Sequence, residues 1–376
     1  MLAPPYYLIG SAGYPNFGDE LIAASWLRHL AEVAPAVDVW LDCPQPGMAQ
    51  NLFEGLHPRL RTTNTLWRAV GDAAHLPVEE VGPRVAALIH GLGSPHYDLG
   101  LLRLRSVRSM HLIGGGYVNG VWPHHAGLVE GMKAVKQLTG APLYATGQGL
   151  MPAAVDAARE LFADFDHVTV RDDASAQAHH LPLGLDDAFL GAQAEIARRP
   201  APPAGLYVCI QSDMADEGRF DEVVTAARPL VEHAARQGKA VHYVEAIPGV
   251  DRLAYDRLAD LIPDEHFVPF SDVWTRGLPV SPEQEWITTR FHLHLLASAA
   301  GARGVAVPIR HGYYDVKHHS LRRLGSGWGV ADGPGPLQVP QGTGSLAEVL
   351  PGLAARKRAE ADLLYPLART PEVLRV

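Results

Sequence analysis

Short apolar runs alternate with amphipathic stretches from the start of the chain. The first apolar run covers residues 6–10, and after a glycine-rich turn an amphipathic stretch covers residues 19–33. One face of that stretch carries large apolar side chains, namely Leu21, Ile22, Trp26, Leu27 and Leu30. A strand followed by an amphipathic helix is the repeating unit of parallel sheets. We therefore expect an α/β protein.

The same pattern predicts the other elements and divides the chain into two halves. In the first half, strands are expected at residues 37–41, 111–113, 142–146 and 168–170, and helices at 123–138 and 155–162. Residues 192–204 are polar and rich in proline without any period, so we place a domain boundary there. In the second half, strands are expected at residues 206–210, 240–245, 286–289 and 304–309, and helices at 220–237, 255–261 and 292–300. Two such halves predict two Rossmann-like domains whose parallel sheets face a central cleft.

The length and charge of the chain restrict its function. The 376 residues suffice for two domains, and residues 345–364 are expected to form a last helix that packs back on the first domain. There are 32 Lys and Arg against 41 Asp and Glu, a net charge of −9, which excludes a general attraction to nucleic acid or anionic lipid. An anionic ligand therefore needs a local basic pocket.

Cysteine usage and the N-terminal residues suggest a cytoplasmic protein. Cys43 and Cys209 lie in apolar runs and belong to no metal-binding spacing, so we expect both to be buried and reduced. The first residues lack the basic and apolar regions of a signal peptide, and no apolar run is long enough to span a membrane.

A glycine-rich segment that ends at Glu20 joins the first strand to the first helix. Its glycines, including Gly13 and Gly18, let backbone amides approach a ligand, and a helix N-terminus favours an anion or an acidic cap. The segment matches neither the dinucleotide nor the P-loop fingerprint. It is either a tight turn capped by Asp19, or a cleft lining. In the second case Asn16, Asp19 and Glu20 contact substrate, and one of the two acids accepts a hydroxyl proton.

Two further glycine clusters end predicted strands of the first half. The strand at residues 111–113 is followed by three successive glycines, Gly114, Gly115 and Gly116. Three positions without a Cβ suit the close passage of a ligand, although a purely structural turn is the alternative. Gln148 and Gly149 repeat this pattern after the strand that ends at Thr146. We predict that all of these residues line a substrate cleft.

Basic residues stand at strand ends in both halves. Arg171 ends a strand of the first half, where it either meets a ligand or pairs with its own acidic neighbours. Arg290, Phe291 and His292 lie at a strand-to-helix junction of the second half. Because strand side chains alternate, Arg290 and His292 are expected to point the same way. Arginine binds carboxylate or phosphate in bidentate fashion, and histidine titrates near neutral pH.

The remaining histidines and basic residues give weaker signals. A basic, aromatic loop follows the last predicted strand, and it is either a plain surface loop or a substrate contact through Arg310, His311 and Lys317. His292 and His294 have no third ligand at a supporting spacing, so we expect no metal. The other histidine pairs are expected to be mostly solvent-exposed: His124 and His125, His179 and His180, His318 and His319.

Five of these segments resemble the polysaccharide pyruvyl transferase family in order and spacing. They are residues 13–20, 114–116, 146–149, 170–172 and 290–292. The resemblance implies a glycosyltransferase-B-like (GT-B-like) fold, with the acceptor on the side of residues 1–195 and phosphoenolpyruvate on the side of residues 205–340. It also implies transfer of a pyruvyl group from phosphoenolpyruvate to sugar hydroxyls, forming a ketal and releasing phosphate. Matched residue by residue, the two arginines and the histidine that hold the donor in the family are Arg171, Arg290 and His292.

The implied reaction fits the residues. Phosphoenolpyruvate carries a phosphate and a carboxylate, which two arginines would hold locally in an acidic protein. Its methylene carbon must be protonated before a hydroxyl adds to the neighbouring carbon. We expect His292 to act as general acid or as the partner of the leaving phosphate, with Asp19 or Glu20 assisting the hydroxyl. The expected partners are phosphoenolpyruvate and a sugar, oligosaccharide or glycolipid acceptor; a lipid-linked acceptor would bring the enzyme to a membrane surface. No further cofactor is expected.

Two positions depart from the family pattern. Phe291 stands where the family commonly has a leucine, which would reshape the donor pocket on that side. Many members have an acid soon after the glycine triplet, whereas Tyr117 and Asn119 stand here. This difference leaves the identity of the acceptor more open than that of the donor.

Two other functions compete with pyruvyl transfer. The first is a nucleotide-sugar glycosyltransferase of the same fold, in which a glutamate at a helix start binds the donor ribose. Aligned on Gly301, that position here is Leu296, which cannot accept a hydrogen bond from a ribose hydroxyl. The second is a non-catalytic protein that binds carbohydrate or an anion, because converging arginines would serve binding alone equally well.

Overall fold

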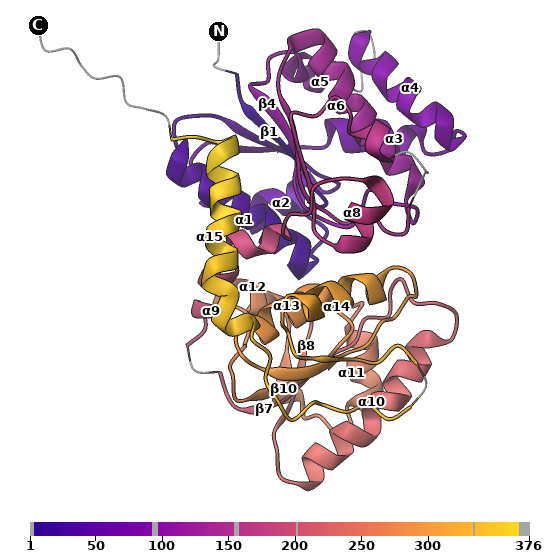
Figure 1. Ribbon diagram of the computed structural model, residues 1–376, viewed down its shortest axis with the longest axis vertical. Coiled ribbons are helices and arrows are strands. Elements are labelled where there is room, and N and C mark those ends of the chain that lie inside the picture. The colour runs from indigo at the N-terminus through magenta and orange to yellow at the C-terminus, as the bar shows by residue number, and fades with distance from the viewer. Residues whose placement is uncertain (1–3, 92–96, 154–157, 201, 334, 368–376) are drawn as a thin grey trace, which may run out of the picture.

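A computed structural model describes residues 4–91, 97–153, 158–200, 202–333 and 335–367, and Figure 1 shows the two sheets one above the other. The first sheet has six parallel strands in the order β3-β2-β1-β4-β5-β6. Their bounds are β1 (Tyr6–Ile9), β2 (Val39–Asp42), β3 (Leu60–Thr63), β4 (Ser109–Leu112), β5 (Leu143–Gln148) and β6 (His167–Val170). The strand order reverses between β1 and β4, and a crevice opens at the carboxyl ends of strands at such a point.

The second sheet repeats this topology. It has six parallel strands in the order β12-β11-β10-β7-β8-β9, and the order reverses between β7 and β10. Their bounds are β7 (Gly205–Cys209), β8 (Val241–Val244), β9 (Phe267–Val268), β10 (Gln284–Thr288), β11 (Arg303–Ala306) and β12 (Gly329–Val330). The predicted α/β class with two parallel sheets is thereby confirmed.

Helices connect the strands and cover the sheets (Figure 1). With the first sheet lie α1 (Phe17–Val33), α2 (Pro46–Leu52), α3 (Thr65–Ala73), α4 (Val78–His90), α5 (Asp98–Leu104), the 3-10 turn η1 (Pro123–His125), α6 (Ala126–Thr139), α7 (Ala158–Leu161), α8 (Asp173–His179), η2 (Asp187–Leu190) and α9 (Ala192–Ala197). With the second lie α10 (Arg219–Arg236), α11 (Arg252–Leu258), η3 (Asp264–His266), α12 (Phe270–Arg276), α13 (Phe291–Ala299) and α14 (Tyr314–Arg323), while α15 (Leu346–Leu364) runs beside both domains. Within the described residues, no helix is both long and apolar enough to cross a bilayer.

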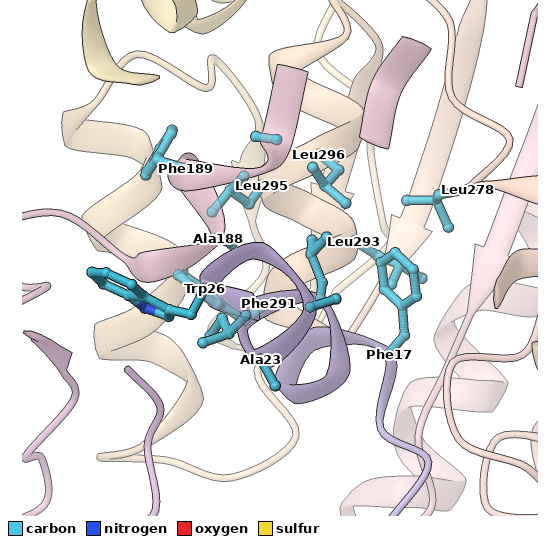
Figure 2. Packing of buried hydrophobic residues seen from close by; sticks show 14 of the residues in the cluster. Phe17, Ala23, Trp26, Ala188, Phe189, Leu278, Phe291, Leu293, Leu295 and Leu296 are labelled. Atoms are coloured by element: carbon cyan, nitrogen blue, oxygen red, sulfur yellow. The ribbon is translucent and has the colours of Figure 1, made fainter. Parts of the chain in front are cut away.

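One apolar core joins the two domains. Helix α13 is buried on almost all sides, as expected of a helix in which six of nine side chains are apolar. Figure 2 shows Phe291, Leu293 and Leu296 of α13 packed beside Phe17 and Trp26 of α1. Because α1 follows the first strand of one sheet and α13 follows a strand of the other, this contact fixes the ends of both strands relative to each other.

The last helix ties the second domain to the first. In Figure 1, α15 runs along one side of both domains. Lys357 of α15 is fully buried, forms an ion pair with Asp187 and lies 2.7 Å from Oε2 of Glu360. Just beyond the helix, the ring of Tyr365 packs edge-on against Tyr6 of β1, with the centroids 4.9 Å apart.

Two predicted segments differ from the structure. The expected linker at residues 192–204 begins with α9, because the buried Glu195 accepts a hydrogen bond from the amide of Leu278 and binds Arg198. Tertiary contacts of this kind stabilise a helix too short to show a period. Of the helix predicted at 155–162, residues 155–157 lie outside the described part. Cys43 and Cys209 are both buried and free.

Candidate active site

A cavity of about 350 Å³ lies between the carboxyl ends of the two sheets. Every wall comes from a loop or helix start directly after a strand, in the first domain after β1, β2, β3, β4 and β6 and in the second after β7, β8, β10 and β11. The volume falls within the range of about 300–1,000 Å³ that is usual for small-molecule sites. Within the described residues, no three histidine, cysteine or carboxylate side chains gather as metal ligands would.

Arg171 enters the cavity from the end of β6. Its side chain is buried, and Nη1 donates to Oδ2 of Asp186 at 2.8 Å. Nε is buried without a hydrogen-bond partner. Gly149 and Gly116 leave the room it needs, since a Cβ on Gly149 would lie 2.7 Å from Nε and one on Gly116 would lie 2.8 Å from Nη2. The two glycines thus let the guanidinium pack closely against the backbone.

Arg290 enters from the second domain, at the residue that precedes α13. Its Nη2 donates to Asp251 at 2.5 Å and lies 3.0 Å from Asp213. The other oxygen of Asp251 accepts the amides of Ala246 and Ile247, so this buried carboxylate is fixed by the backbone. Burial alone would lower the pKa of Arg290, but Asp251 and Asp213 raise it well above the ordinary value. Arg290 is therefore a permanently charged and oriented group.

Asp186 links the first domain to His292 of the second. Its Oδ1 lies 3.3 Å from Nε2 of His292, while its Oδ2 holds Arg171. Burial would raise the pKa of Asp186, but His292 and Arg171 together hold it well below its usual range. On the other side of the ring, Gly18 of α1 leaves space for Nδ1, where a Cβ would overlap it. His292 is thus positioned by both domains.

Lys317 of α14 is the third basic group of the cavity. Its Nζ lies 3.3 Å from the ring centroid of Tyr313 and 4.7 Å from that of Tyr314. Among the described residues no carboxylate lies within ion-pair distance of it. Burial and the neighbouring Arg171 lower its pKa well below the ordinary value, against the effect of Asp19. A Cβ on Gly116 would lie 3.0 Å from Nζ, so Arg171 and Lys317 approach the same point of the backbone.

The two acids of the first helix have different positions. Asp19 lines the cavity and accepts a hydrogen bond from Asn16. Burial raises its pKa, although His292, Lys317 and Arg171 lower it. Glu20, predicted beside it, is fully buried and accepts the amide of Gly13 at 2.8 Å, outside the cavity lining. Successive helical residues point about 100° apart, so the two acids cannot share one face.

Several predicted cleft residues lie behind the lining rather than in it. Gly114 is buried and donates its amide to Asp187, while Gln148 donates its side-chain amide to three strand-end carbonyls. Gly115 and Gly149 likewise lie outside the lining, as does Gly13, whose φ of 84° and close approach to the carbonyl of Gln45 require glycine. These residues shape the floor of the cavity.

Only part of the basic loop after β11 reaches the cavity. Lys317 lines the cavity, whereas Arg310 and His311 lie outside it, and His311 is exposed with its amide bonded to Asp216. The expectation that the histidine pairs are solvated is wrong for His179, which is buried at the end of α8, and for His318. His318 is buried between α13 and α14, where its ring nitrogens bond to His294 and to the carbonyl of Thr289.

The cavity combines predicted and unpredicted residues. Of the predicted ones, it brings together Asn16, Gly18, Asp19, Gly116, Arg171, Arg290, Phe291, His292 and Lys317. Sequence reasoning missed the carboxylates that orient them, Asp186 and Asp251, because no motif separates these from the other acids. It also missed the tryptophans and tyrosines of one wall, although Tyr313 stands in the basic loop that was singled out.

Comparisons with known proteins agree with this architecture. A family model described as polysaccharide pyruvyl transferase matches residues 16–273. No curated protein matches the sequence. Solved structures match the fold at low identity. A structure from Listeria monocytogenes, named as a UDP-N-acetylglucosamine 2-epimerase, is 9% identical with a TM-score of 0.53 and covers 97% of this chain and 91% of that chain.

Two further structures are similar over their length. S. aureus MnaA with UDP is 9% identical, covering 86% of this chain and 88% of that chain with a TM-score of 0.49. UGT2 of Phytolacca americana, complexed with UDP-2fluoro-glucose and pterostilbene, is 14% identical, covering 97% and 94% with a TM-score of 0.45. At such identities the likeness concerns the fold alone, and the Listeria monocytogenes structure supports a two-domain α/β fold of the GT-B type.

Proposed function

The chain belongs to the polysaccharide pyruvyl transferase family, and on this basis we propose that it moves a pyruvyl group from phosphoenolpyruvate to two hydroxyls of a sugar in a glycan or glycolipid. The products are a ketal and inorganic phosphate. One observation carries the proposal. Arg171 and Arg290, from opposite domains and each oriented by a buried carboxylate, reach one cavity together with Lys317.

Such a set of groups suits a small ligand with two anionic ends. Phosphoenolpyruvate has a phosphate and a carboxylate, each of which accepts hydrogen bonds from a guanidinium fork. Arg171 lines the cavity, and its Nη2 shares the space above Gly116 with Lys317. Because this pocket is a small basic exception in an acidic protein, the donor would be drawn to it and not to the surface.

The chemistry requires one proton donor and one proton acceptor. A proton adds to the methylene carbon of phosphoenolpyruvate, which makes the neighbouring carbon electrophilic. A sugar hydroxyl adds to that carbon and loses its proton. A second hydroxyl then displaces phosphate and loses its proton, which the leaving phosphate oxygen takes up as its bond to carbon breaks, and the ketal closes. No oxidant or reductant is needed.

His292 and Asp19 fit these two roles. His292 lines the cavity, and the hydrogen bond from its Nε2 to Asp186 sets the tautomer and orientation of the ring. We assign to it the proton for the methylene carbon or the leaving phosphate. Asp19 lines the same cavity, and its raised pKa suits a group that accepts a hydroxyl proton. Glu20 is not assigned a role because it faces the loop behind the cavity.

Phe291 stands where the family commonly has leucine, and its contacts give this difference a role. The guanidinium of Arg171 lies 4.8 Å from the centroid of the Phe291 ring. A cation over an aromatic face is attracted to it, so Phe291 supports Arg171 from the second domain. In this protein the donor arginine of one domain is therefore held partly by the other.

A nucleotide sugar is the alternative donor, but the residue at the position that would bind its ribose does not reach the cavity. Leu296, the residue at the position where related folds bind the ribose, is fully buried in the core between the domains and does not line the cavity. A ribose hydroxyl would find neither access nor an acceptor there.

Incubation with donor and acceptor separates these functions. The purified chain is mixed with phosphoenolpyruvate and a panel of glycosides, and released phosphate is measured together with the mass of the glycoside. We expect phosphate and a product heavier by one pyruvate less one water, and neither with Arg290→Ala. Consumption of a nucleotide sugar without phosphate release from phosphoenolpyruvate would overturn the proposal. A stabilising shift with phosphoenolpyruvate but no turnover of any glycoside would point to a binding protein.

A further inference from the structure

The cavity has a second end whose lining is aromatic instead of charged. Trp67 of α3, Trp122 before η1 and His125 of η1 line it, together with Tyr117. These residues all come from the first domain. We propose that this aromatic wall is the acceptor subsite and that it stacks against the apolar face of a pyranose ring. This inference rests on the proposed function, because it supplies the second substrate of the same reaction.

The rings form one continuous surface. Trp122 stacks on His125 with the ring centroids 6.0 Å apart and an angle of 15° between the planes. His125 meets Trp67 edge-on at 4.9 Å, and Trp67 lies 5.6 Å from Tyr117. Nδ1 of His125 bonds to the carbonyl of Tyr117 at 2.7 Å, which fixes the imidazole in the wall. Burial lowers the pKa of His125 to about 4, so the ring is neutral and behaves as part of the aromatic surface.

The wall reaches the donor groups directly. Trp122 meets the ring of Tyr313 edge-on at 6.0 Å, and that same ring lies 3.3 Å from Nζ of Lys317. The hydroxyl of Tyr313 donates to the carbonyl of Gly116, the residue beside Arg171. A sugar lying on Trp122 is therefore adjacent to the anion that Arg171 and Lys317 would hold.

The chemistry of the wall selects a sugar ring. Aromatic faces are electron-rich, and the C–H groups on one side of a pyranose carry partial positive charge and form an apolar patch. The hydroxyls at the ring edge remain free to meet Asp19 and the donor. Tyr14, 60% exposed at the cavity rim, marks where the rest of a glycan would leave. At about 350 Å³, the cavity has room for the donor and a single sugar unit.

Truncation of the wall provides the kinetic test. With a panel of methyl hexopyranosides as acceptors, Trp122→Ala should raise the acceptor KM about tenfold and leave the phosphoenolpyruvate KM within about twofold. Trp122→Phe, which keeps a ring, should restore most of the loss. Trp40→Ala removes a tryptophan that lies outside the cavity and should change neither KM. An unchanged acceptor KM in Trp122→Ala, with turnover intact, would overturn the subsite and leave the proposed function standing.

A binding measurement provides a test without turnover. Saturation-transfer NMR on the full chain should show signal on the ring C–H protons of one face of a methyl hexopyranoside, and this signal should be lost in Trp122→Ala. An acyclic hexitol, which has the hydroxyls but no ring face, should give no signal. If the wild type releases no phosphate with any acceptor, the proposed function fails, and this signal alone decides the subsite. Equal signals from the hexitol and the pyranoside would overturn it.

Discussion

Asp186 of the first domain lies 3.3 Å from Nε2 of His292, which the second domain contributes. The same carboxylate holds Arg171 at 2.8 Å through its other oxygen. One buried acid thus sets the positions of two groups that we assign to the reaction, and it does so across the domain boundary. Helix α1 closes the other side of the imidazole at Gly18.

Replacing Asp186 by asparagine should lower kcat about 100-fold, because a misplaced catalytic group loses its alignment with the substrate. The measurement is the rate of phosphate release at saturating donor and acceptor. Asp332→Asn is the matched control, since Asp332 also pairs with a histidine, His319, but outside the cavity. Equal rates in the two variants would contradict the positioning role.

The same substitution gives a pH dependence of stability. Because the pKa of Asp186 is lowered by folding, its ionised form stabilises the folded state, fully so above the unfolded pKa of about 4. The advantage of the wild type over Asp186→Asn in free energy of unfolding should therefore be present at pH 5 and shrink below about pH 4. Urea unfolding at each pH measures it, and an advantage that grows on acidification would contradict the assigned ion pairs.

The parts of this site that the sequence predicts are those set by local pattern. Arg171, Arg290 and His292 follow apolar runs, and the carboxyl ends of parallel strands must share an edge of a sheet. The carboxylates that orient them were not predictable, because Asp251 precedes Arg290 by 39 residues and looks like any other acid of a surface loop. Trp67 and Trp122 belong to segments whose place beside the cavity depends on how α3 and η1 pack. Glu20 was expected to line the cleft beside Asp19 but lies outside the cavity lining. The reason is that neighbouring residues of a helix point in different directions.

In the fold, too, the elements with a clear local pattern were predicted, and those that depend on tertiary contacts were not. Strands and long helices with a clear period were predicted within a few residues, for example α10 and β7. The hydrophobic pattern predicts no element between β2 and β4, although this stretch forms β3 and α2 to α5. Strand β3 has no fully buried residue, so it shows little contrast between its two faces.

Gly116→Ala tests whether the basic groups act together. A Cβ there would lie 2.8 Å from Nη2 of Arg171 and 3.0 Å from Nζ of Lys317, the charged ends of both side chains. Because the buried guanidinium must shift, the free energy of unfolding should fall by about 1–2 kcal/mol, and the KM for phosphoenolpyruvate should rise about tenfold. Gly71→Ala, where a Cβ meets no atom within 4 Å, should leave the donor KM unchanged. A donor KM that Gly116→Ala leaves intact would place the donor elsewhere.

Lys317 should make donor binding depend on pH. Burial and Arg171 lower its pKa in the free protein, whereas a bound phosphate or carboxylate favours the ammonium form. Binding therefore takes up a proton, and the affinity for phosphoenolpyruvate should fall as the pH rises from 7 to 9. Calorimetric titration in buffers of different ionisation enthalpy measures both effects. Lys317→Met should bind more weakly at pH 7 and lose the proton uptake; uptake that persists would assign it to another group.

Lys357 should be a main source of stability for the contact between α15 and the first domain. Its ammonium group is buried between Asp187 and Glu360, and its removal leaves Asp187 buried without that cation. Lys357→Met should lower the free energy of unfolding by about 3–5 kcal/mol. Arg356→Ala, on the exposed side of the same helix, should cost no more than about 0.5 kcal/mol. Similar losses in both variants would mean that the helix is held by its apolar contacts.

The most direct test of the central claim is the reaction carried out in D₂O with phosphoenolpyruvate and a glycoside acceptor. Protonation of the methylene carbon from solvent, followed by loss of phosphate, predicts one phosphate released per ketal and one deuterium in the methyl group of each ketal. Mass spectrometry of the glycoside gives both the ketal and its deuterium content. A product without deuterium would contradict the proposed protonation, and consumption of a nucleotide sugar with no ketal from phosphoenolpyruvate would contradict pyruvyl transfer itself.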